Sequence, residues 1–268
     1  MISADLKGKA VLVTGGVSGI GLAAAELFAS NGASVAVNHL SDDPAAGEVI
    51  ERLTGNGLEV IAAPGDVSDP AQGEAMVQQA AEQLGRLDVL INNAGTSNTR
   101  EPIAYDNLDA MTEDFWSKIL QTNLIGAFRC ARAAAKYLKA SEGAIVSTAS
   151  VAGLGIPGSS IAYGASKGAL INLTRSLAHA LAPDVRVNAV APGLVRTPWT
   201  EPWPDSRKNQ TIENCLLKRM VEPEEIAQTM LFLACSPAIT GQTLAVDCGR
   251  TCCQASHRGS YPRNGSGK

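Results

Sequence analysis

Seven short apolar runs alternate along the chain with longer segments of helical pattern. The runs lie at residues 9–14, 34–37, 59–63, 87–91, 143–149, 185–190 and 243–246. Continuous apolar runs of this length are typical of strands that are buried on both faces of a parallel sheet. Parallel strands require crossover connections, and helical patterns supply them at residues 22–30, 44–54, 111–138 and 223–234. The alternation therefore predicts an α/β fold with a doubly wound parallel sheet.

The size and charge of the chain limit its organisation and its partners. No linker or change of composition divides the 268 residues, so we expect one domain at 1–249 and a polar tail at 250–268. The formal net charge of -4 argues against nucleic acid or an anionic membrane as a partner. No apolar run approaches the length of a membrane span, and residues 1–9 lack the apolar segment of a signal peptide. We therefore expect a cytoplasmic protein.

A glycine-rich turn, T-G-G-V-S-G-I-G at residues 14–21, joins the first apolar run to the first helical segment. Gly15 permits a tight turn, while Gly19 and Gly21 let the backbone approach a ligand and let the helix pack on the strand. The start of the helix would direct free N–H groups toward the same place, which is how helix N-termini bind phosphates. We interpret the turn as a dinucleotide site rather than an ordinary structural turn. Its contacts would come from Gly15, Val17, Ser18, Gly19, Ile20 and Gly21.

A second candidate site lies at residues 150–167, where a loop of small residues follows the fifth apolar run. Tyr163 and Lys167 are four residues apart, so on a helix they share one face. An ammonium group beside a phenol lowers the pKa of the phenol, which would let Tyr163 exchange a proton near neutral pH. Ser150, at the end of the apolar run, would hold a substrate oxygen near that phenol. The alternative is a solvent-exposed Tyr–Lys pair without a catalytic role.

Six motifs occur in a fixed order along the chain. They are T-G-x-x-x-G-x-G at 14–21, N-N-A-G at 92–95, Asn123, Ser150, Y-x-x-x-K at 163–167 and P-G-x-x-x-T at 192–197. Each is modest alone, but together, in this order and spacing, they are specific. From about residue 6 to about residue 249 the chain resembles the short-chain dehydrogenase/reductase family. Within it, the 3-oxoacyl-carrier-protein reductases and the bacterial glucose dehydrogenases are most similar in pattern.

The resemblance implies a Rossmann-like sheet of seven strands and hydride transfer between NADP or NAD and a small-molecule alcohol or ketone. Ser150 would orient the carbonyl or hydroxyl group of the substrate. Tyr163 would be the general acid in reduction and the general base in oxidation. Lys167 would lower the pKa of Tyr163 and bind the nicotinamide ribose. Asn123 would hold a water in a proton relay behind Lys167.

The resemblance also implies cofactor contacts beyond the glycine-rich turn. Three further sets of residues would hold the cofactor: Asp66 and Val67 at the adenine, Asn93, Ala94 and Gly95 at the ribose, and Pro192, Gly193, Val195 and Thr197 at the nicotinamide amide. Residues 194–219 resemble the substrate lid of the family. Trp199 and Trp203 in that segment would either form the wall of an apolar pocket or pack as ordinary aromatic residues.

The end of the second predicted strand bears on the choice between NADP and NAD. In NAD-selective relatives a carboxylate there binds the ribose 2′-hydroxyl and repels a 2′-phosphate. Here none of residues 38–41 is acidic, and Asn38, His39 and Ser41 can donate hydrogen bonds to a phosphate. Ser18 stands where many NADP-preferring relatives carry Arg or Lys, so a strong cationic clamp is missing. Because the missing carboxylate is the larger effect, we predict a preference for NADP(H), with NAD(H) also accepted.

Two features depart from the family pattern. Members commonly end a few residues after D-G-G, whereas residues 250–268 follow Asp247-Cys248-Gly249 here. The 3-oxoacyl-carrier-protein reductases carry a basic residue that docks the acidic carrier, and His179 stands in its place. This difference weakens the interpretation of the chain as a carrier-protein reductase.

The end of the chain also contains a C-x3-C-C-x3-H pattern. Its spacing differs from that of a zinc finger, so we expect no metal site at Cys248, Cys252, Cys253 and His257.

Two alternatives to a dehydrogenase follow from the same residues. A non-catalytic dinucleotide-binding regulator would not need Asn, Ser, Tyr and Lys together. A dehydratase or epimerase can share Y-x-x-x-K, but those relatives usually carry T-G-x-x-G-x-x-G, which differs from the turn in this chain. The resemblance further implies a homotetramer or homodimer. The helices around Asn123 and Tyr163 are rich in Ala, Gly and Leu, which suits close packing across a two-fold axis.

Overall fold

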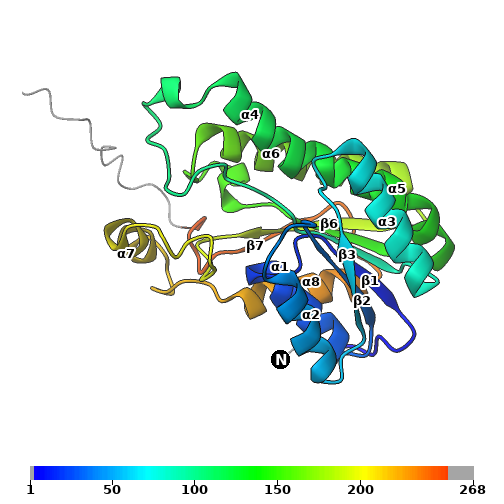
Figure 1. Ribbon diagram of the computed structural model, residues 1–268. Coiled ribbons are helices and arrows are strands. Elements are labelled where there is room, and N and C mark those ends of the chain that lie inside the picture. Colours follow the sequence, from blue (N-terminus) through cyan, green and yellow to red (C-terminus); the bar gives the residue numbers. More distant parts are fainter. Residues whose placement is uncertain (1–2, 253–268) are drawn as a thin grey trace, which may run out of the picture.

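The computed structural model describes residues 3–252 and contains a sheet of seven parallel strands. Their order across the sheet is β3-β2-β1-β4-β5-β6-β7 (Figure 1). The strands are β1 (Ala10–Val13), β2 (Ser34–His39), β3 (Val60–Pro64), β4 (Val89–Asn92), β5 (Ala144–Thr148), β6 (Arg186–Pro192) and β7 (Thr243–Val246). This order is that of a Rossmann-like, doubly wound sheet, so the predicted fold class is confirmed.

Helices cover both faces of the sheet (Figure 1). One face carries α1 (Gly19–Ser30), α2 (Ala46–Gly55) and α8 (Pro223–Cys235), and the other carries α3 (Pro70–Leu84), α5 (Ala127–Ser141) and α6 (Ile161–Leu181). Successive side chains of a strand point to opposite faces. Val11 and Val13 enter the core beneath α1 and α8, while Leu12 enters the core beneath α3 and α5, and all three are fully buried. A continuous apolar run is the result of this two-sided burial.

The starts of the helices follow from local sequence. The Asp69 side chain caps α3 by accepting hydrogen bonds from the N–H groups of Ala71 and Gln72, at 2.9 and 2.8 Å. Ser160 caps α6 in the same way, because its Oγ accepts from the Tyr163 N–H at 3.0 Å. α1 begins at Gly19, earlier than the predicted residue 22. The glycine-rich turn therefore includes the first turn of α1.

The helical pattern over residues 111–138 is interrupted in the structure. α4 (Glu113–Leu120) continues through a π-helical segment (Gln121–Gly126) into α5. Asn123 lies in this segment and is fully buried. The prediction of one long helix is wrong here, and the residue at the wider turn, Asn123, hydrogen-bonds the distant Thr96 and Ser166. Such π-helical interruptions are frequent at functional sites.

Residues 194–219, which the sequence predicts to be irregular, contain a helix, α7 (Asp205–Glu213). The two ends of this segment are tied together at its base. Val195 and Val221 form a parallel bridge, and the Val221 N–H donates to the Leu194 carbonyl at 2.9 Å. In Figure 1, α7 projects beyond the sheet at the edge where the strands end. The segment is therefore a loop with a fixed base and a projecting tip.

Two sequence expectations concern the tail and the membrane. Cys253 and His257, which belong to the C-x3-C-C-x3-H pattern, lie outside the described residues, as does the tail from 253 onward. Within residues 3–252, no group of three or more His, Cys, Asp or Glu side chains is placed to hold a metal ion. None of the helices described there is both long and apolar enough to cross a membrane.

Candidate active site

The candidate site lies where β1 and β4 end. The helices that follow these two neighbouring strands leave on opposite faces of the sheet, which opens a crevice at their carboxyl ends. A cavity of about 310 Å³ lies there. Among the predicted site residues, it brings together Gly15, Ser18, Gly19, Ile20, Asn93, Ala94, Gly95, Ser150, Tyr163, Lys167, Pro192, Gly193, Val195 and Thr197. Four segments far apart in the sequence therefore meet at one cavity.

The other predicted site residues do not line this cavity. Val17 is buried in the core beneath α1, and Asn123 is buried in the π-helical segment. The remaining six lie in β2, beyond the ends of β2 and β3, or within the first turn of α1. They are Gly21, the buried Asn38, His39, Ser41, Asp66 and Val67.

The glycine-rich turn is packed too tightly to accept larger residues. A Cβ atom on Gly21 would lie 2.0 Å from the carbonyl oxygen of Gly15 and 2.5 Å from Nδ2 of Asn93. Gly15 itself has a φ of +61°, and its Cβ would lie 3.0 Å from Cα of Ala94. At Gly15 and Gly19 the backbone of the turn is itself the surface of the cavity. A phosphate group can approach such a backbone closely.

The start of α1 faces the same cavity and has no internal anion. Ser18 precedes the helix in an extended conformation, and its side chain makes no capping hydrogen bond. The first turn of α1 contains no acidic residue. The leading N–H groups of a helix carry a partial positive charge and bind anions when no side chain caps them. The turn and the helix start therefore fit the pyrophosphate of a dinucleotide.

Asn93 braces the turn from the neighbouring strand end. Its Nδ2 donates to the carbonyls of Thr14 and Gly15, at 3.1 and 3.0 Å. Its Oδ1 accepts a hydrogen bond from Oγ1 of Thr148 at 3.1 Å. The side chain thus connects the ends of β1, β4 and β5. The sequence assigned Asn93 to the cofactor ribose, whereas the structure gives its amide a scaffolding role.

Asn38 has a similar role, which corrects its predicted function. Its Nδ2 donates to the carbonyls of Ala63 and Gly65, at 2.9 and 2.8 Å, and its Oδ1 accepts from the Gly15 N–H at 3.1 Å. The residue is 2% exposed. Because the amide is used internally, Asn38 is not placed to donate to a cofactor phosphate. It lies within β2, which extends to His39, two residues beyond the predicted strand.

The neighbours of Asn38 are more accessible. His39 is half-buried at the end of β2, and its Nδ1 donates to the Leu40 carbonyl at 2.8 Å. Ser41 is exposed. At the end of β3, Oδ1 of Asp66 accepts from the Ser68 N–H at 2.7 Å, and the Val67 carbonyl accepts from the Arg129 guanidinium. These groups lie beside the ends of β2 and β3, away from the cavity that contains Tyr163.

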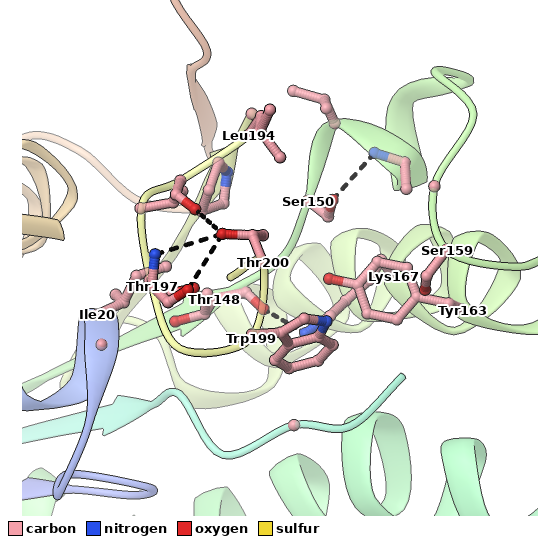
Figure 2. Close-up of a pocket in the computed structure, with 18 of the residues that line it drawn as sticks. Ile20, Thr148, Ser150, Ser159, Tyr163, Lys167, Leu194, Thr197, Trp199 and Thr200 are labelled. Carbon is pink, nitrogen blue, oxygen red and sulfur yellow. Dashed lines mark hydrogen bonds between the residues drawn. The ribbon is translucent and has the colours of Figure 1, made fainter. Parts of the chain in front are cut away.

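The Tyr–Lys pair lies on one face of α6, as predicted, and faces the cavity. Figure 2 shows the Tyr163 hydroxyl directed toward Ser150. The ammonium group of Lys167 is buried, donates to the Thr148 carbonyl at 2.7 Å, and lies 5.7 Å from the centre of the Tyr163 ring. Oγ of Ser150 accepts from the Ala152 N–H at 3.1 Å, which fixes the hydroxyl at the start of a short helical turn (Val151–Leu154). The three groups therefore converge.

The ionisation of this pair differs from the sequence prediction. Burial raises the pKa of Tyr163 to about 12, although a hydrogen bond with Ser150 acts in the opposite direction. Burial also lowers the pKa of Lys167 to about 8. Because the cost of burying the phenolate is the largest influence, the pKa of Tyr163 shifts upward here, opposite to the direction that the sequence predicts. The Lys167 ammonium is instead held by the Thr148 carbonyl.

Asn123 supports the pair from behind. Its Oδ1 accepts from the Thr96 N–H at 2.7 Å, and its Nδ2 donates to the Thr96 carbonyl and to Oγ of Ser166, at 3.0 and 3.1 Å. Gly95 lies between, since a Cβ there would be 3.3 Å from Oδ1 of Asn123 and 3.5 Å from Nζ of Lys167. The side chain thus joins the loop after β4 to α6.

Known proteins resemble this chain over most of its length. A family model described as enoyl-(acyl carrier protein) reductase matches residues 15–251. The chain is 39% identical over 246 residues to meso-2,3-butanediol dehydrogenase of Serratia marcescens, covering 91% of this chain and 94% of that protein. The chain belongs to the short-chain dehydrogenase/reductase family. Over 249 residues it is also 37% identical to the 3-oxoacyl-[acyl-carrier-protein] reductase FabG of Thermotoga maritima, covering 91% and 98%.

Solved short-chain dehydrogenases have the same fold. One from Burkholderia cenocepacia J2315, solved in complex with NADP, gives a TM-score of 0.83 at 31% identity and covers 92% of this chain and 100% of its own. Another, from Mycobacterium marinum, gives 0.83 at 34% identity, covering 92% and 97%. As a member of this family, the protein is an NAD(P)-dependent oxidoreductase that interconverts an alcohol and a ketone. The glycine-rich turn and the start of α1 fit that cofactor.

The dehydrogenase cavity also contains residues that sequence reasoning missed. Ser159, Arg207 and Arg250 line it. Arg207 belongs to α7, in a segment predicted to be irregular, and Arg250 was assigned to the tail. Trp199 packs edge-on against Tyr163, with ring centres 5.9 Å apart and planes at 65° (Figure 2). Arg250 follows the last strand closely, and ligands of such sheets bind at the carboxyl ends of the strands. This position in the sequence is the signal that would have identified Arg250 as a site residue.

Proposed function

We propose that this dehydrogenase acts on a secondary alcohol or its ketone, with Tyr163 as the general acid and base. One observation supports the proposal above all. Tyr163, Ser150 and Lys167 line the same cavity as the glycine-rich turn. A hydroxyl that can donate a proton and a cradle that can hold a dinucleotide share one space. Neither a regulator nor a structural turn requires that arrangement.

In this proposal each residue has one task. The bound nicotinamide supplies the hydride donor or acceptor. Ser150, fixed by the Ala152 N–H, orients the substrate oxygen toward the Tyr163 hydroxyl. Tyr163 donates its proton to that oxygen during reduction and removes it during oxidation. Lys167, with a pKa lowered to about 8, returns a proton to Tyr163, and Asn123 would hold the water that links Lys167 to solvent.

We further propose that NADP(H) is preferred and NAD(H) accepted. No acidic side chain occupies residues 38–41, so the charge that repels a 2′-phosphate in NAD-selective relatives is missing there. With Asn38 used internally, the groups left to meet a 2′-phosphate are the hydroxyls of Ser18 and Ser41 and, in the protonated ring alone, Nε2 of His39, because Nδ1 already donates to Leu40. The NADP complex of the Burkholderia relative supports the same preference.

The domain boundaries are proposed on the same basis. Residues 1–249 would form the catalytic domain, with 194–219 as the substrate lid and 250–268 as a C-terminal tail. Trp199 supports the lid assignment, because it comes from this segment and covers the Tyr163 ring. Arg250 lines the cavity, so the beginning of the tail would belong functionally to the site.

We propose a homotetramer in the cytoplasm. Two separate sets of exposed apolar side chains support the assembly: Ile125 and Phe128 along the π segment and α5, and Phe232 and Leu244 on α8 and β7. Each set could be buried across its own two-fold axis. The buried thiols of Cys130 and Cys248 are typical of a reducing compartment. Light scattering at micromolar concentration tests the assembly: a dimer would contradict the tetramer, and a monomer would contradict assembly altogether.

The activity itself is tested by a screen of secondary alcohols and ketones with both cofactors. The expected result is substrate-dependent consumption of NADPH or production from NADP, with slower turnover of NAD(H). Cofactor binding without turnover of any alcohol or ketone would instead support the non-catalytic regulator. Loss of water from a hydroxyacyl substrate, without any net change in NADPH, would support the dehydratase alternative.

A further inference from the structure

The cavity around Tyr163 carries positive charge, and none of the described residues that line it is acidic. Its cations are Lys167, Arg207 and Arg250, in a chain with 26 acidic and 22 basic residues. A cavity with this bias in an acidic protein attracts anionic ligands. The cofactor phosphates are expected at the start of α1. Arg207 and Arg250 belong to α7 and to the segment after β7, on the lid side, so they remain to be explained.

The backbone of Arg250 is held in a turn, whereas its side chain remains available to bind a ligand. The buried Asp247 carboxylate accepts hydrogen bonds from the N–H groups of Gly249 and Thr251, at 2.9 and 2.7 Å, and the Arg250 N–H donates to the Asp247 carbonyl at 3.1 Å. Within residues 3–252, no ion pair or hydrogen bond engages the half-buried guanidinium. A guanidinium on a rigid support is suited to bind a carboxylate through two parallel hydrogen bonds.

Arg207 differs because its guanidinium already has partners. Its Nη2 donates to the Gly158 carbonyl at 3.0 Å, and the group lies 5.5 Å from the centre of the Trp203 ring. Burial lowers its pKa from the usual value for arginine. Arg207 therefore attaches α7 to the loop before α6 and adds positive charge to the wall. Of the two lid-side arginines, Arg250 is the one with donors available for a ligand.

Ser159 is a second group without a partner in the same cavity. The residue is 3% exposed, and its Oγ has no hydrogen-bond partner among the described residues. Figure 2 places it next to the Tyr163 ring. A buried hydroxyl without a partner is costly, and one that lines a ligand cavity is explained by a polar atom of the ligand.

We propose that the substrate is an anionic ketone or alcohol, whose carboxylate pairs with Arg250 while Ser159 hydrogen-bonds a polar atom near the reacting carbon. This inference rests on the proposed oxidoreductase function and specifies its substrate class. The carboxylate lies on the lid side, where Arg207 adds positive charge and Trp199 covers the Tyr163 ring. A phosphate ester offers Arg250 the same oxygen geometry, so the test includes both anions.

The test compares pairs of ketones that share the reacting carbonyl and differ in whether they carry an anionic group. The pairs are 3-oxobutanoate with its methyl ester, 4-oxopentanoate with its methyl ester, and dihydroxyacetone phosphate with dihydroxyacetone. We expect kcat/KM to be at least about tenfold higher for the anionic member of a pair, as expected for a desolvated charge-assisted contact. A preference confined to the third pair would identify the anion as a phosphate. Equal values, or faster turnover of the neutral member in every pair, would overturn the inference.

Variants then assign the preference to Arg250. Arg250→Gln should remove the preference for anionic ketones, mainly by raising KM for the anion. The kcat/KM for neutral ketones and the KM for NADPH should change by no more than about twofold. Arg250→Lys should keep part of the preference, because the charge remains and the fork geometry is lost. Lys7→Gln is the matched control, since it removes one positive charge from an exposed residue before β1 and should change nothing. A rise in KM for NADPH alone would make Arg250 a cofactor ligand and refute the proposal.

A binding measurement separates this proposal from the proposed function. In the presence of NADP, 4-oxopentanoate should raise the melting temperature of Tyr163→Phe, whereas its methyl ester should not, and Arg250→Gln should abolish the shift. Ser159→Ala should weaken the binding of acid and ester alike. Binding of the acid without turnover by the wild-type protein would contradict the oxidoreductase function alone. Turnover of neutral ketones with no binding preference for acids would contradict only the anionic substrate.

Discussion

The two sides of the cavity are built differently. On the side of β1 and β2, the amides of Asn38 and Asn93 hydrogen-bond backbone groups of the glycine-rich turn and its neighbours. On the lid side, Ser159 and Arg250 present groups with no partner among the described residues. A cofactor used by a whole family can be bound by backbone groups, which buried side-chain amides hold in position. A particular substrate requires side chains that remain available, so the lid side carries the specificity.

The largest effect should come from Tyr163, where the two sides meet. Tyr163→Phe removes one oxygen, so the fold and cofactor binding should survive. Turnover should fall by about 10²–10⁴-fold, the usual contribution of a positioned acid or base. Steady-state rates and NADPH fluorescence measure the two quantities on one sample. Retention of more than about a tenth of wild-type turnover would remove Tyr163 from the proposed role.

A glycine substitution should show how little the cofactor side can adjust. Gly21→Ala places a Cβ 2.0 Å from the Gly15 carbonyl oxygen, and that oxygen belongs to backbone that cannot turn aside. We expect a loss of about 3 kcal/mol or more of unfolding free energy and a much weaker affinity for NADPH. The matched control is Gly47→Ala in α2, where a Cβ meets nothing within 4 Å. That change should stabilise the protein by about 0.5–1 kcal/mol. Equal behaviour of the two variants in denaturant melts would contradict the packing argument.

The same contrast explains how far sequence reasoning reached. The parallel sheet follows from the alternation of apolar runs and helical patterns, and the shared helix face of Tyr163 and Lys167 follows from their spacing. Both signals are local and can be read directly from the sequence. The π-helical segment around Asn123 and the internal role of Asn38 depend on partners such as Thr96 and Gly65. Those partners are distant along the chain, so composition and spacing carry no signal for them. Ser159 and Arg250 were missed for the same reason, since cavity walls are assembled by tertiary packing.

The buried ammonium of Lys167 should make stability depend on pH. Its pKa is about 8 in the folded protein against an ordinary value of 10.5, so between these values the unfolded chain binds a proton that the folded chain lacks. Stability should therefore rise with pH from about 8 to about 10, by about 1.4 kcal/mol per pH unit at most. Above pH 10 the raised pKa of Tyr163 acts in the opposite direction. Urea unfolding at pH 7, 8, 9 and 9.5 measures the slope. Lys167→Met should lack this rise, and parallel curves for the two proteins would refute it.

The smallest of these effects concerns cofactor choice at the end of β2. His39 is half-buried there, and its Nδ1 donates to the Leu40 carbonyl. His39→Asp would introduce the carboxylate that NAD-selective relatives carry at this place, where it accepts from a ribose 2′-hydroxyl and repels a 2′-phosphate. The ratio of kcat/KM for NADPH over NADH should fall at least tenfold, about 1.4 kcal/mol. His179→Asp adds the same charge to an exposed position on α6 and should leave the ratio unchanged.

Asn38→Ala should instead destabilise the glycine-rich turn and weaken the binding of NADPH and NADH together, because the Asn38 amide holds that turn in place. If His39→Asp left the ratio within twofold, the discrimination would reside in Ser18 and Ser41, and the end of β2 would be scaffold like the rest of the cofactor side.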